Sequence, residues 1–293
     1  MLLAAGSSAA PLPEGSYADF LIVPVGPVPL AEFERDDRGA APPDAPSGNP
    51  AAPGADPAAD QRIPGGGSGV RVKEQDPAEI PPRAVYLRRA KDKFWRIPCF
   101  LNAIPSPVRV PLADSEITLL LEAPGARGSF NPLDTVRLPA ASRTVLVLLT
   151  KPVGAKEWTR PQVTLIPVAS ADVAQLMLVN ASHALACGVV VNHTQKLLLN
   201  PLKHTLWRPD AAAGNRAVPV SLAMAGPDQR FLAPFFNSHL ALPPAATTIL
   251  VAYEVTAEES FRRAKYLRGS FKPGDVRPAV PFPAEANGDA AVP

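Results

Sequence analysis

Histidine and cysteine are scarce in this chain of 293 residues, which contains 4 His, 2 Cys and 3 Met. Two cysteines are too few for the disulfide framework of a small secreted domain, and neither stands beside a histidine at a zinc-binding spacing. No run approaches the roughly 18 uncharged apolar residues of a membrane-spanning helix. The sequence therefore predicts no disulfide-rich scaffold, no metal or cofactor site and no transmembrane segment.

Catalytic motifs are missing as well. The glycine-rich stretch at 65–69, GGGSG, has neither the preceding strand nor the following lysine of a phosphate-binding loop. Of the four histidines, only His183 and His193 would be brought together by a hairpin, and an enzyme that uses them needs an acidic or thiol partner within hydrogen-bond reach. We expect a protein that is not an enzyme, with such a histidine enzyme as a weaker alternative.

Proline, by contrast, is abundant at 37 residues, and hydrophobic residues make up 46% of the chain, enough for real cores. The length fits two domains of ordinary size. Charge is unevenly distributed. Residues 1–82 hold 12 Asp/Glu against 5 Lys/Arg, net −7, while residues 83–293 hold 24 Lys/Arg against 15 Asp/Glu, net +9. An acidic arm is therefore joined to a basic body.

The first 82 residues divide into three predicted parts. Residues 1–16 resemble the remnant of an export signal, with an apolar run and the small residues Ser-Ala-Ala, which suggests a periplasmic or extracellular location. Residues 17–30 contain an isolated strand, Tyr17–Val25, interpreted as an edge strand of its own domain or, alternatively, as a strand added to a neighbour. Residues 31–82, rich in Pro, Ala, Gly and Asp, are predicted to be a disordered acidic linker.

From Arg83 onward, short apolar runs alternate with proline, glycine and asparagine about every 10–12 residues, which is typical of an all-β protein. The segments Val136–Leu149 and Leu240–Tyr253 share six of 14 residues at an offset of 104. This internal repeat predicts two tandem antiparallel β-sandwich domains, at 83–170 and 171–256. Thr256 and Glu259 form a capping box that predicts one short helix at 257–269, followed by a proline-rich tail at 270–293.

Candidate binding residues are aromatic and basic. Three tryptophans would form a stacking platform for sugar rings if exposed, although packing in the core is the simpler interpretation. The basic stretch 83–96 and the predicted helix supply guanidinium groups, but alternating basic and apolar residues also describe a strand with one solvated face, so nucleic-acid binding is disfavoured. The residues concerned are Trp95, Trp158, Trp207, Arg88, Arg89, Arg262 and Arg263.

Cys99 and Cys187 fall one in each half of the repeat. They are predicted either to form an inter-domain disulfide or, as the simpler interpretation, to be two buried free thiols.

Five strings resemble, in their order, uncharacterised exported bacterial proteins built from two β-sandwiches: KFWRIPCFLNAIPSPVRVP, EITLLLEAP, VRLPAASRTVLVLLT, QLMLVNASHALACGVVVN and LALPPAATTILVAY. The resemblance covers roughly residues 83–256 and implies no activity or catalytic residues. The long acidic linker and the arginine-rich segment depart from it. We expect a non-catalytic structural or protein-interaction module of the bacterial envelope or secreted fraction, whose partner is another envelope protein or a second copy of itself. A carbohydrate-binding module that binds a glycan is the alternative.

Overall fold

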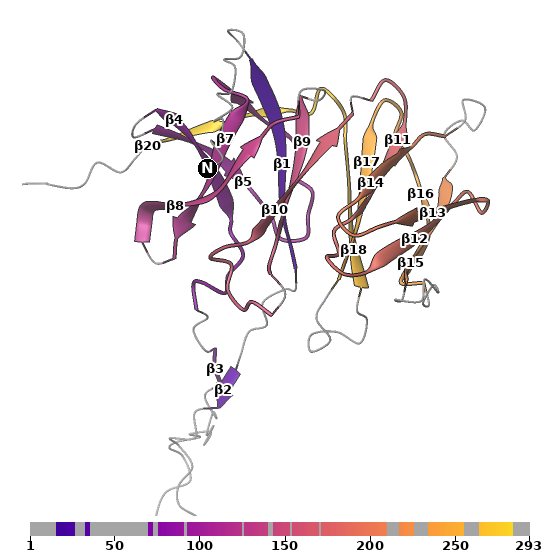
Figure 1. The fold of residues 1–293 in the computed structure, drawn as a ribbon, viewed down its shortest axis with the longest axis horizontal. Coiled ribbons are helices and arrows are strands. Elements are labelled where there is room, and N and C mark those ends of the chain that lie inside the picture. The colour runs from indigo at the N-terminus through magenta and orange to yellow at the C-terminus, as the bar shows by residue number, and fades with distance from the viewer. Residues whose placement is uncertain are drawn as a thin grey trace, which may run out of the picture. The chain divides into compact units, whose positions relative to one another are not determined.

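Every regular element that the structure describes is a β-strand. The computed structural model describes residues 16–26, 33–35, 70–72, 76–90, 93–124, 126–139, 143–152, 154–169, 171–209, 217–225, 234–254 and 264–283 (Figure 1). The all-β prediction is therefore confirmed. The proposed export-signal remnant lies outside these residues, except for Ser16. The predicted linker at 31–82 lies largely outside them too.

Contacts divide the chain into two compact units, of which the first comprises residues 1–28 with 77–293 and the second residues 29–76. The described part of the second unit is one antiparallel pair, β2 (Phe33–Arg35) with β3 (Val70–Val72). The larger unit is not divided at residue 170, and the two domain boundaries expected from the repeat stay a prediction.

One sheet is organised around β1, in the order β10–β9–β1–β6–β19. Its strands are β1 (Tyr17–Val25), β6 (Val108–Pro111), β9 (Thr144–Thr150), β10 (Gln162–Val168) and β19 (Arg277–Pro278). β1 pairs antiparallel with β6 and parallel with β9, so it pairs within its own chain as expected. The expected edge position is wrong. The run FLIV is apolar at every position, and a strand whose two faces are both buried belongs inside a sheet.

A second sheet has the order β20–β5–β4–β7–β8. Its strands are β4 (Ala84–Ala90), β5 (Lys93–Pro98), β7 (Glu116–Ala123), β8 (Ala126–Arg137) and β20 (Val280–Pro283). Residues alternate between its faces: Val85 and Leu87 join the apolar cluster shared with the β1 sheet, while Tyr86 joins an aromatic cluster on the opposite face. The segment 270–293, predicted as a proline-rich tail, contains β19 and β20 in its described part, and each of them joins a sheet.

Two four-stranded sheets complete the larger unit, in the orders β14–β11–β17–β18 and β13–β12–β15–β16. Their strands are β11 (Gln175–Asn180), β12 (Ala186–Val191), β13 (Gln195–Leu199), β14 (His204–Trp207), β15 (Val218–Ala225), β16 (Phe236–Leu240), β17 (Thr247–Glu254) and β18 (Ala264–Phe271). One apolar cluster, which includes Leu176, Val189 and Leu250, is shared by these two sheets.

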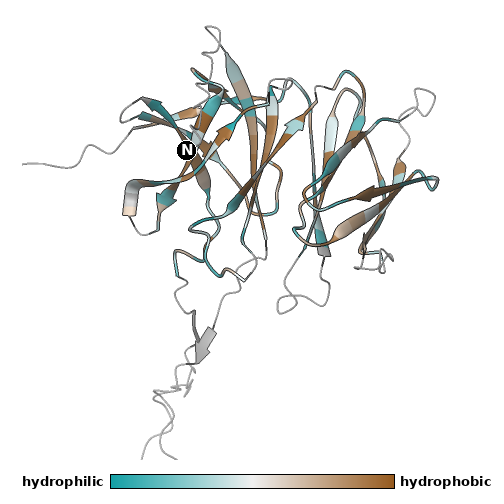
Figure 2. Cartoon of the chain, in the orientation of Figure 1, coloured by the Kyte–Doolittle hydropathy of each residue, from teal (hydrophilic) through white to brown (hydrophobic). Residues whose placement is uncertain are grey.

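A further apolar cluster joins the β1 sheet to the β11 sheet. Leu21 and Val23 of β1 belong to the same cluster as Met177 and Val179 of β11. Four sheets therefore share three large clusters, and the sheets do not display two separate sandwiches, because both middle sheets are apolar on both faces (Figure 2). Packing here is close: a Cβ added at Gly269 of β18 would lie 2.6 Å from the Ile104 Cβ, so only glycine fits.

The strand pairing of the first half recurs in the second. β10–β9–β1–β6 and β18–β17–β11–β14 have the same order, each with one parallel pair between two antiparallel ones. The matching register pairs Asp19 with Thr144 and Gln175 with Thr247. The structural offset of the closing strand is therefore 103 and not the 104 of the sequence match. A slip of one residue turns every side chain to the other face. Val147 accordingly faces the β4 sheet, whereas Val251 faces the β1 sheet.

The predicted helix at 257–269 is wrong where it is described, because residues 264–271 form β18. Residues 255–263, which include the predicted cap, lie outside the described residues. Leu267 and Phe271 are buried against the β1 sheet, and the residues between them alternate with a period of two. Pairing with β17 along the whole strand outweighs the helical propensity of AKYLR.

Of the two interpretations of the cysteines, the simpler one, two buried free thiols, agrees with the structure, and the inter-domain disulfide does not. Cys99 and Cys187 are both free and buried, and they belong to different apolar clusters, so each behaves as a small apolar side chain. The Cys99 thiol donates to the Pro82 carbonyl oxygen at 3.0 Å.

Both thiols are expected to resist modification until the chain unfolds. Burial raises the pKa of Cys99 and of Cys187 from 9.0 to about 12. At pH 8 this lowers the thiolate fraction about a thousandfold, so a disulfide reagent such as DTNB should react with neither in the native state and with both in denaturant. The native state favours the neutral thiol, so this stabilisation is complete below pH 9 and is lost as the pH rises toward 12. Rapid native labelling of either thiol would contradict this assignment.

Candidate functional site

The three tryptophans do not form one platform. Trp158 is buried, with 3% of its surface exposed. Trp95 is half-buried and covered by the Arg89 guanidinium, 4.7 Å from the ring centroid. Trp207 is half-buried, packs against a different apolar cluster, and its indole N–H donates to the Gln195 side-chain oxygen. A sugar-stacking surface made by these residues together is therefore not present.

The other candidates from the sequence are also separate. Arg88 and Arg89 are exposed on β4, while Arg262 and Arg263 lie outside the described residues. His183 shares a hydrogen bond of 2.9 Å with the Thr150 hydroxyl, and His193 is exposed in the turn between β12 and β13. Within the described ranges, no group of three or more His, Cys, Asp or Glu side chains could hold a metal ion.

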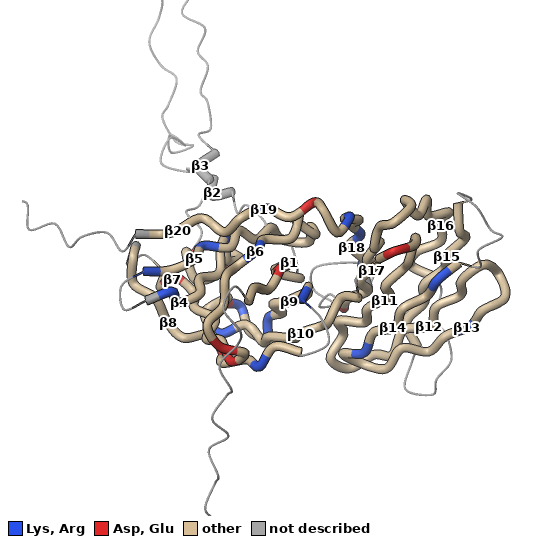
Figure 3. Tube along the Cα trace, turned by 90° about the horizontal axis from the view of Figure 1, so that it is seen from above, with Lys and Arg blue, Asp and Glu red and all other residues tan. Residues whose placement is uncertain are grey.

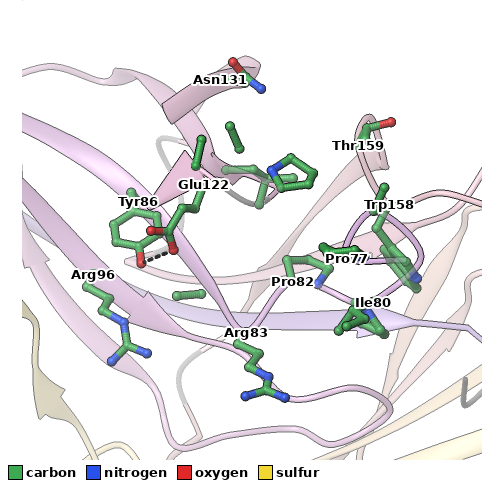
Figure 4. Close-up of a pocket in the computed structure, with 17 residues that line it drawn as sticks. Pro77, Ile80, Pro82, Arg83, Tyr86, Arg96, Glu122, Asn131, Trp158 and Thr159 are labelled. Atoms are coloured by element: carbon green, nitrogen blue, oxygen red, sulfur yellow. Dashed lines mark hydrogen bonds between the residues drawn. The ribbon is translucent and has the colours of Figure 1, made fainter. Parts of the chain in front are cut away.

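A groove with a volume of about 530 Å³ lies where the segment 77–84 passes the ends of β4, β5, β7 and β8 (Figure 4). We call it the proline-walled groove. One wall contains Pro77, Ile80, Pro81 and Pro82, and the rest of the lining includes small and apolar residues of β7 and β8, the polar residues Asn131 and Thr159, and five larger side chains. These five are Arg83, Tyr86, Arg96, Glu122 and Trp158.

The proline wall is held in place by hydrogen bonds to the rest of the unit. The Trp158 backbone N–H donates to the Ala78 carbonyl at 2.7 Å, and the Cys99 backbone N–H donates to the Arg83 carbonyl at 3.0 Å. The Cys99 thiol holds the Pro82 carbonyl between them. Since each proline also fixes its own φ, the wall loses little conformational entropy when a ligand binds.

Among the described residues, Glu122 is the one carboxylate that lines the groove, and both of its oxygens already accept hydrogen bonds. One oxygen accepts the Gly128 backbone N–H at 2.9 Å, and the other accepts the Tyr86 hydroxyl at 3.4 Å. Burial and the charge of Glu122 raise the pKa of Tyr86, partly opposed by Arg96. The carboxylate therefore acts as a hydrogen-bond acceptor that fixes the phenol, and Tyr86 stays neutral and donates.

Tyr86 is held rigidly from behind by an aromatic cluster. Its ring centroid lies 4.5 Å from that of Phe130 and 5.2 Å from that of Phe282, in tilted and edge-on arrangements. Phe94 contacts Phe130 in the same cluster at 4.5 Å. Such aromatic pairs contribute about 0.5–1.5 kcal/mol each beyond burial. The cluster brings together β4, β5, β8 and β20, so the far C-terminal strand helps to position the groove.

Two guanidinium groups stand at one side of the groove. Arg83 directly precedes β4, Arg96 lies on β5, both are exposed, and both are drawn on the same side of Tyr86 (Figure 4). With Glu122 engaged by Tyr86 and Gly128, this end of the groove carries a net positive charge. Arginine binds carboxylates with two parallel hydrogen bonds. The arrangement therefore suits an apolar ligand that carries a carboxylate at one end.

The sequence pointed to part of this groove only. Arg83, Tyr86 and Arg96 lie in the basic and aromatic stretch noted above, and Trp158 was a candidate for a different reason. Glu122 and the prolines were missed. The run IPPR at 80–83, placed directly before a strand, was the available signal, since consecutive prolines make a stiff extended segment.

Comparison with known proteins identified no relative: no protein-family model matches the chain, and no curated protein matches it significantly. The resemblance to exported proteins with two β-sandwiches therefore stays a prediction. No helix in the described part of the chain has the length and apolar character required to cross a membrane.

Proposed function

We propose that the protein is a non-catalytic interaction module of the bacterial envelope or secreted fraction, built as two tandem β-sandwiches, whose proline-walled groove binds an extended acidic segment of a partner protein. The repeated strand pairing supports the tandem organisation, because each half has a four-strand sheet with the same order and directions. The observation that carries the binding function is the pair Arg83 and Arg96 at one side of a preformed groove that has a wall of proline and other apolar side chains.

The groove has the properties of a peptide site. Its volume of about 530 Å³ lies in the range of ligand pockets and holds a few extended residues. Proline and alanine side chains offer a smooth apolar surface, whereas the Tyr86 hydroxyl and the two guanidinium groups fix the orientation of a ligand. Grooves that recognise extended proline-rich segments are lined by aromatic side chains, which Tyr86 and Trp158 supply here.

A binding role agrees with the chemistry of the polar groups. Proton transfer needs a group whose proton can reach a substrate, but the Glu122 carboxylate already accepts two hydrogen bonds from the protein. Arg83 and Arg96 contribute guanidinium groups with several N–H donors each. The groove thus holds fixed donors and positive charge, which favour binding and orientation.

Fluorescence anisotropy with two labelled peptides tests the proposal. We expect the peptide PPLDPPLD to bind at least about tenfold more tightly than PPLNPPLN, because a charge-assisted hydrogen bond contributes about 1.5–3 kcal/mol. The double variant Arg83→Glu, Arg96→Glu should lose this preference. The matched double variant Arg88→Glu, Arg89→Glu makes the same change in charge at two exposed residues that do not line the groove. This control should keep the preference for the acidic peptide.

Two results would contradict the proposal. Equal affinity for both peptides, or equal loss in the two double variants, would show that the groove does not select a carboxylate. Binding on a glycan array that Arg83→Glu, Arg96→Glu leaves unchanged, without binding of either peptide, would favour the carbohydrate alternative.

A further inference from the structure

The edge strands of the larger unit differ in how they are protected. Proteins block sheet edges with proline, bulges, short strands or charged side chains, because a free edge pairs with other chains. β10 contains Pro167, β20 contains Pro281 and Pro283, and β8 contains Pro132 beside a register shift. β13, β14, β16 and β19 have five residues or fewer.

β18 has neither proline, nor a bulge, nor a short length; its protection is the positive charge of Lys265 and Arg268, which repels basic strands but not acidic ones. Its eight residues, AKYLRGSF, contain no proline and pair with β17 in unbroken register from Ala264 to Phe271. Among the described residues, no strand pairs with its other side. Alternate residues of such a strand direct their N–H and C=O groups toward the free edge. We infer that the free edge of β18 is a second binding site, which takes an acidic, extended segment of another protein as an added antiparallel or parallel strand.

The charge of β18 indicates the chemistry of the partner. Lys265 and Arg268 are exposed on the strand and Lys272 follows it directly. Figure 3 shows lysine or arginine positions in blue beside the β18 label. The nearby carboxylates are engaged: Asp275 accepts the Lys272 backbone N–H at 3.1 Å, and Glu254 accepts the Ser182 hydroxyl at 3.0 Å. A partner strand that carries Asp or Glu side chains would complement this edge.

A second copy of the chain fits the edge less well. Pairing β18 with itself about a two-fold axis would bring the lysine and arginine side chains of both copies together, and like charges across a strand pair are destabilising. Tyr266 is 45% exposed, and its ring centroid lies 4.4 Å from that of Phe236. An apolar side chain of the added strand can pack against this ring.

The repeat identifies the residue with which to test the edge. At the structural offset of 103, Pro167 of β10 corresponds to Ser270 of β18, since Pro167 pairs with Val145 and Ser270 pairs with Thr248. An edge strand accommodates proline where the backbone nitrogen faces away from the neighbouring strand. The position shared by Pro167 and Ser270 should therefore tolerate proline. Ser270→Pro should fold and block the edge, while Ser270→Ala removes the same hydroxyl, which contacts Thr248 at 2.8 Å, and keeps the N–H.

The probe is a fluorescein-labelled peptide of alternating glutamate and valine, EVEVEVEV, with KVKVKVKV as its charge control. We expect the wild type and Ser270→Ala to bind the acidic peptide, with hydrogen-exchange protection appearing in β18. Ser270→Pro should weaken binding at least about tenfold. The double variant Lys265→Glu, Arg268→Glu should also weaken binding of the acidic peptide and should instead prefer KVKVKVKV. This variant keeps the proposal testable if Ser270→Pro does not fold.

Three outcomes would overturn the inference. The first is equal binding by Ser270→Pro and Ser270→Ala. The second is absence of binding to the wild type, or protection confined to the residues of the proline-walled groove. The third is a dimer that Ser270→Pro dissociates, which would assign the edge to a second copy. The groove variants Arg83→Glu and Arg96→Glu leave β18 intact, so failure of one proposal is distinguishable from failure of the other.

Discussion

Replacement of Asn180 by aspartate is expected to lower the free energy of unfolding at pH 7 by more than about 3 kcal/mol, because it leaves a charge buried and unpaired. Asn180 is fully buried at the end of β11. Its amide nitrogen donates to the carbonyls of Leu185, Leu199 and Asn200 at 2.8, 3.0 and 3.2 Å, and its oxygen accepts the Ser182 N–H. Aspartate would place a carboxylate oxygen against those three carbonyl oxygens.

The pH dependence of this variant follows from the same contacts. Burial and the three carbonyls disfavour the charged form, so the folded-state pKa of an aspartate here lies above its unfolded value of about 3.9. The cost relative to the wild type is therefore largest at neutral pH and decreases as the pH falls toward 4, where the protonated acid can donate one hydrogen bond. Urea unfolding at pH 7 and pH 4.5 measures the difference.

Asn192→Asp is the matched control for the same chemical change. Asn192 is exposed in the β12–β13 turn with a φ of 52°, a backbone conformation that aspartate also adopts. We expect a change within about 0.5 kcal/mol. If Asn180→Asp is no more destabilising than Asn192→Asp, the three carbonyls are not held by the Asn180 amide.

The segments that form strands were predictable from the sequence, because strand formation depends largely on local composition. Short apolar runs between proline and asparagine indicated an all-β chain, and Tyr17–Val25 was recognised as a strand. The repeat also emerged from the sequence, although one residue out of register. A match between residue types does not show which face of the sheet a side chain occupies. In a strand, a shift of one residue moves every side chain to the opposite face. Only the pairing of Asp19 with Thr144 and of Gln175 with Thr247 fixes the offset.

Other features depend on contacts between distant segments. A capping box and a helix-forming sequence pointed to a helix where β18 lies, because nothing local shows that Leu267 and Phe271 meet the β1 sheet. The groove unites residues 77–84, β7 and Trp158, which are far apart in the chain. The tryptophans were candidate binding residues because indole rings stack on sugars. Their solvent exposure, which decides whether they can bind a ligand, depends on tertiary packing that the sequence does not show.

Truncation of Phe20 to alanine is expected to cost about 3–5 kcal/mol, as for other fully buried phenylalanines. Phe20 has no exposed surface and faces the cluster between the β1 and β4 sheets. β1 is also the central strand of its sheet, so a cavity there touches neighbours on both sides. Phe100→Ala is the matched control, since Phe100 is 56% exposed and its truncation should cost less than about 0.5 kcal/mol.

Leu21→Ala, one residue further along β1, separates the contributions of the two faces. Leu21 is fully buried in the cluster that joins the β1 sheet to the β11 sheet, so its truncation should cost about 2–5 kcal/mol. Because this cluster includes residues from both halves of the repeat, the loss should appear in one cooperative unfolding transition detected equally by Trp95 and Trp207 fluorescence in single-tryptophan variants. If Leu21→Ala instead shifts the transition seen by Trp95 and leaves that seen by Trp207 unchanged, the halves unfold independently and the shared cluster does not couple them.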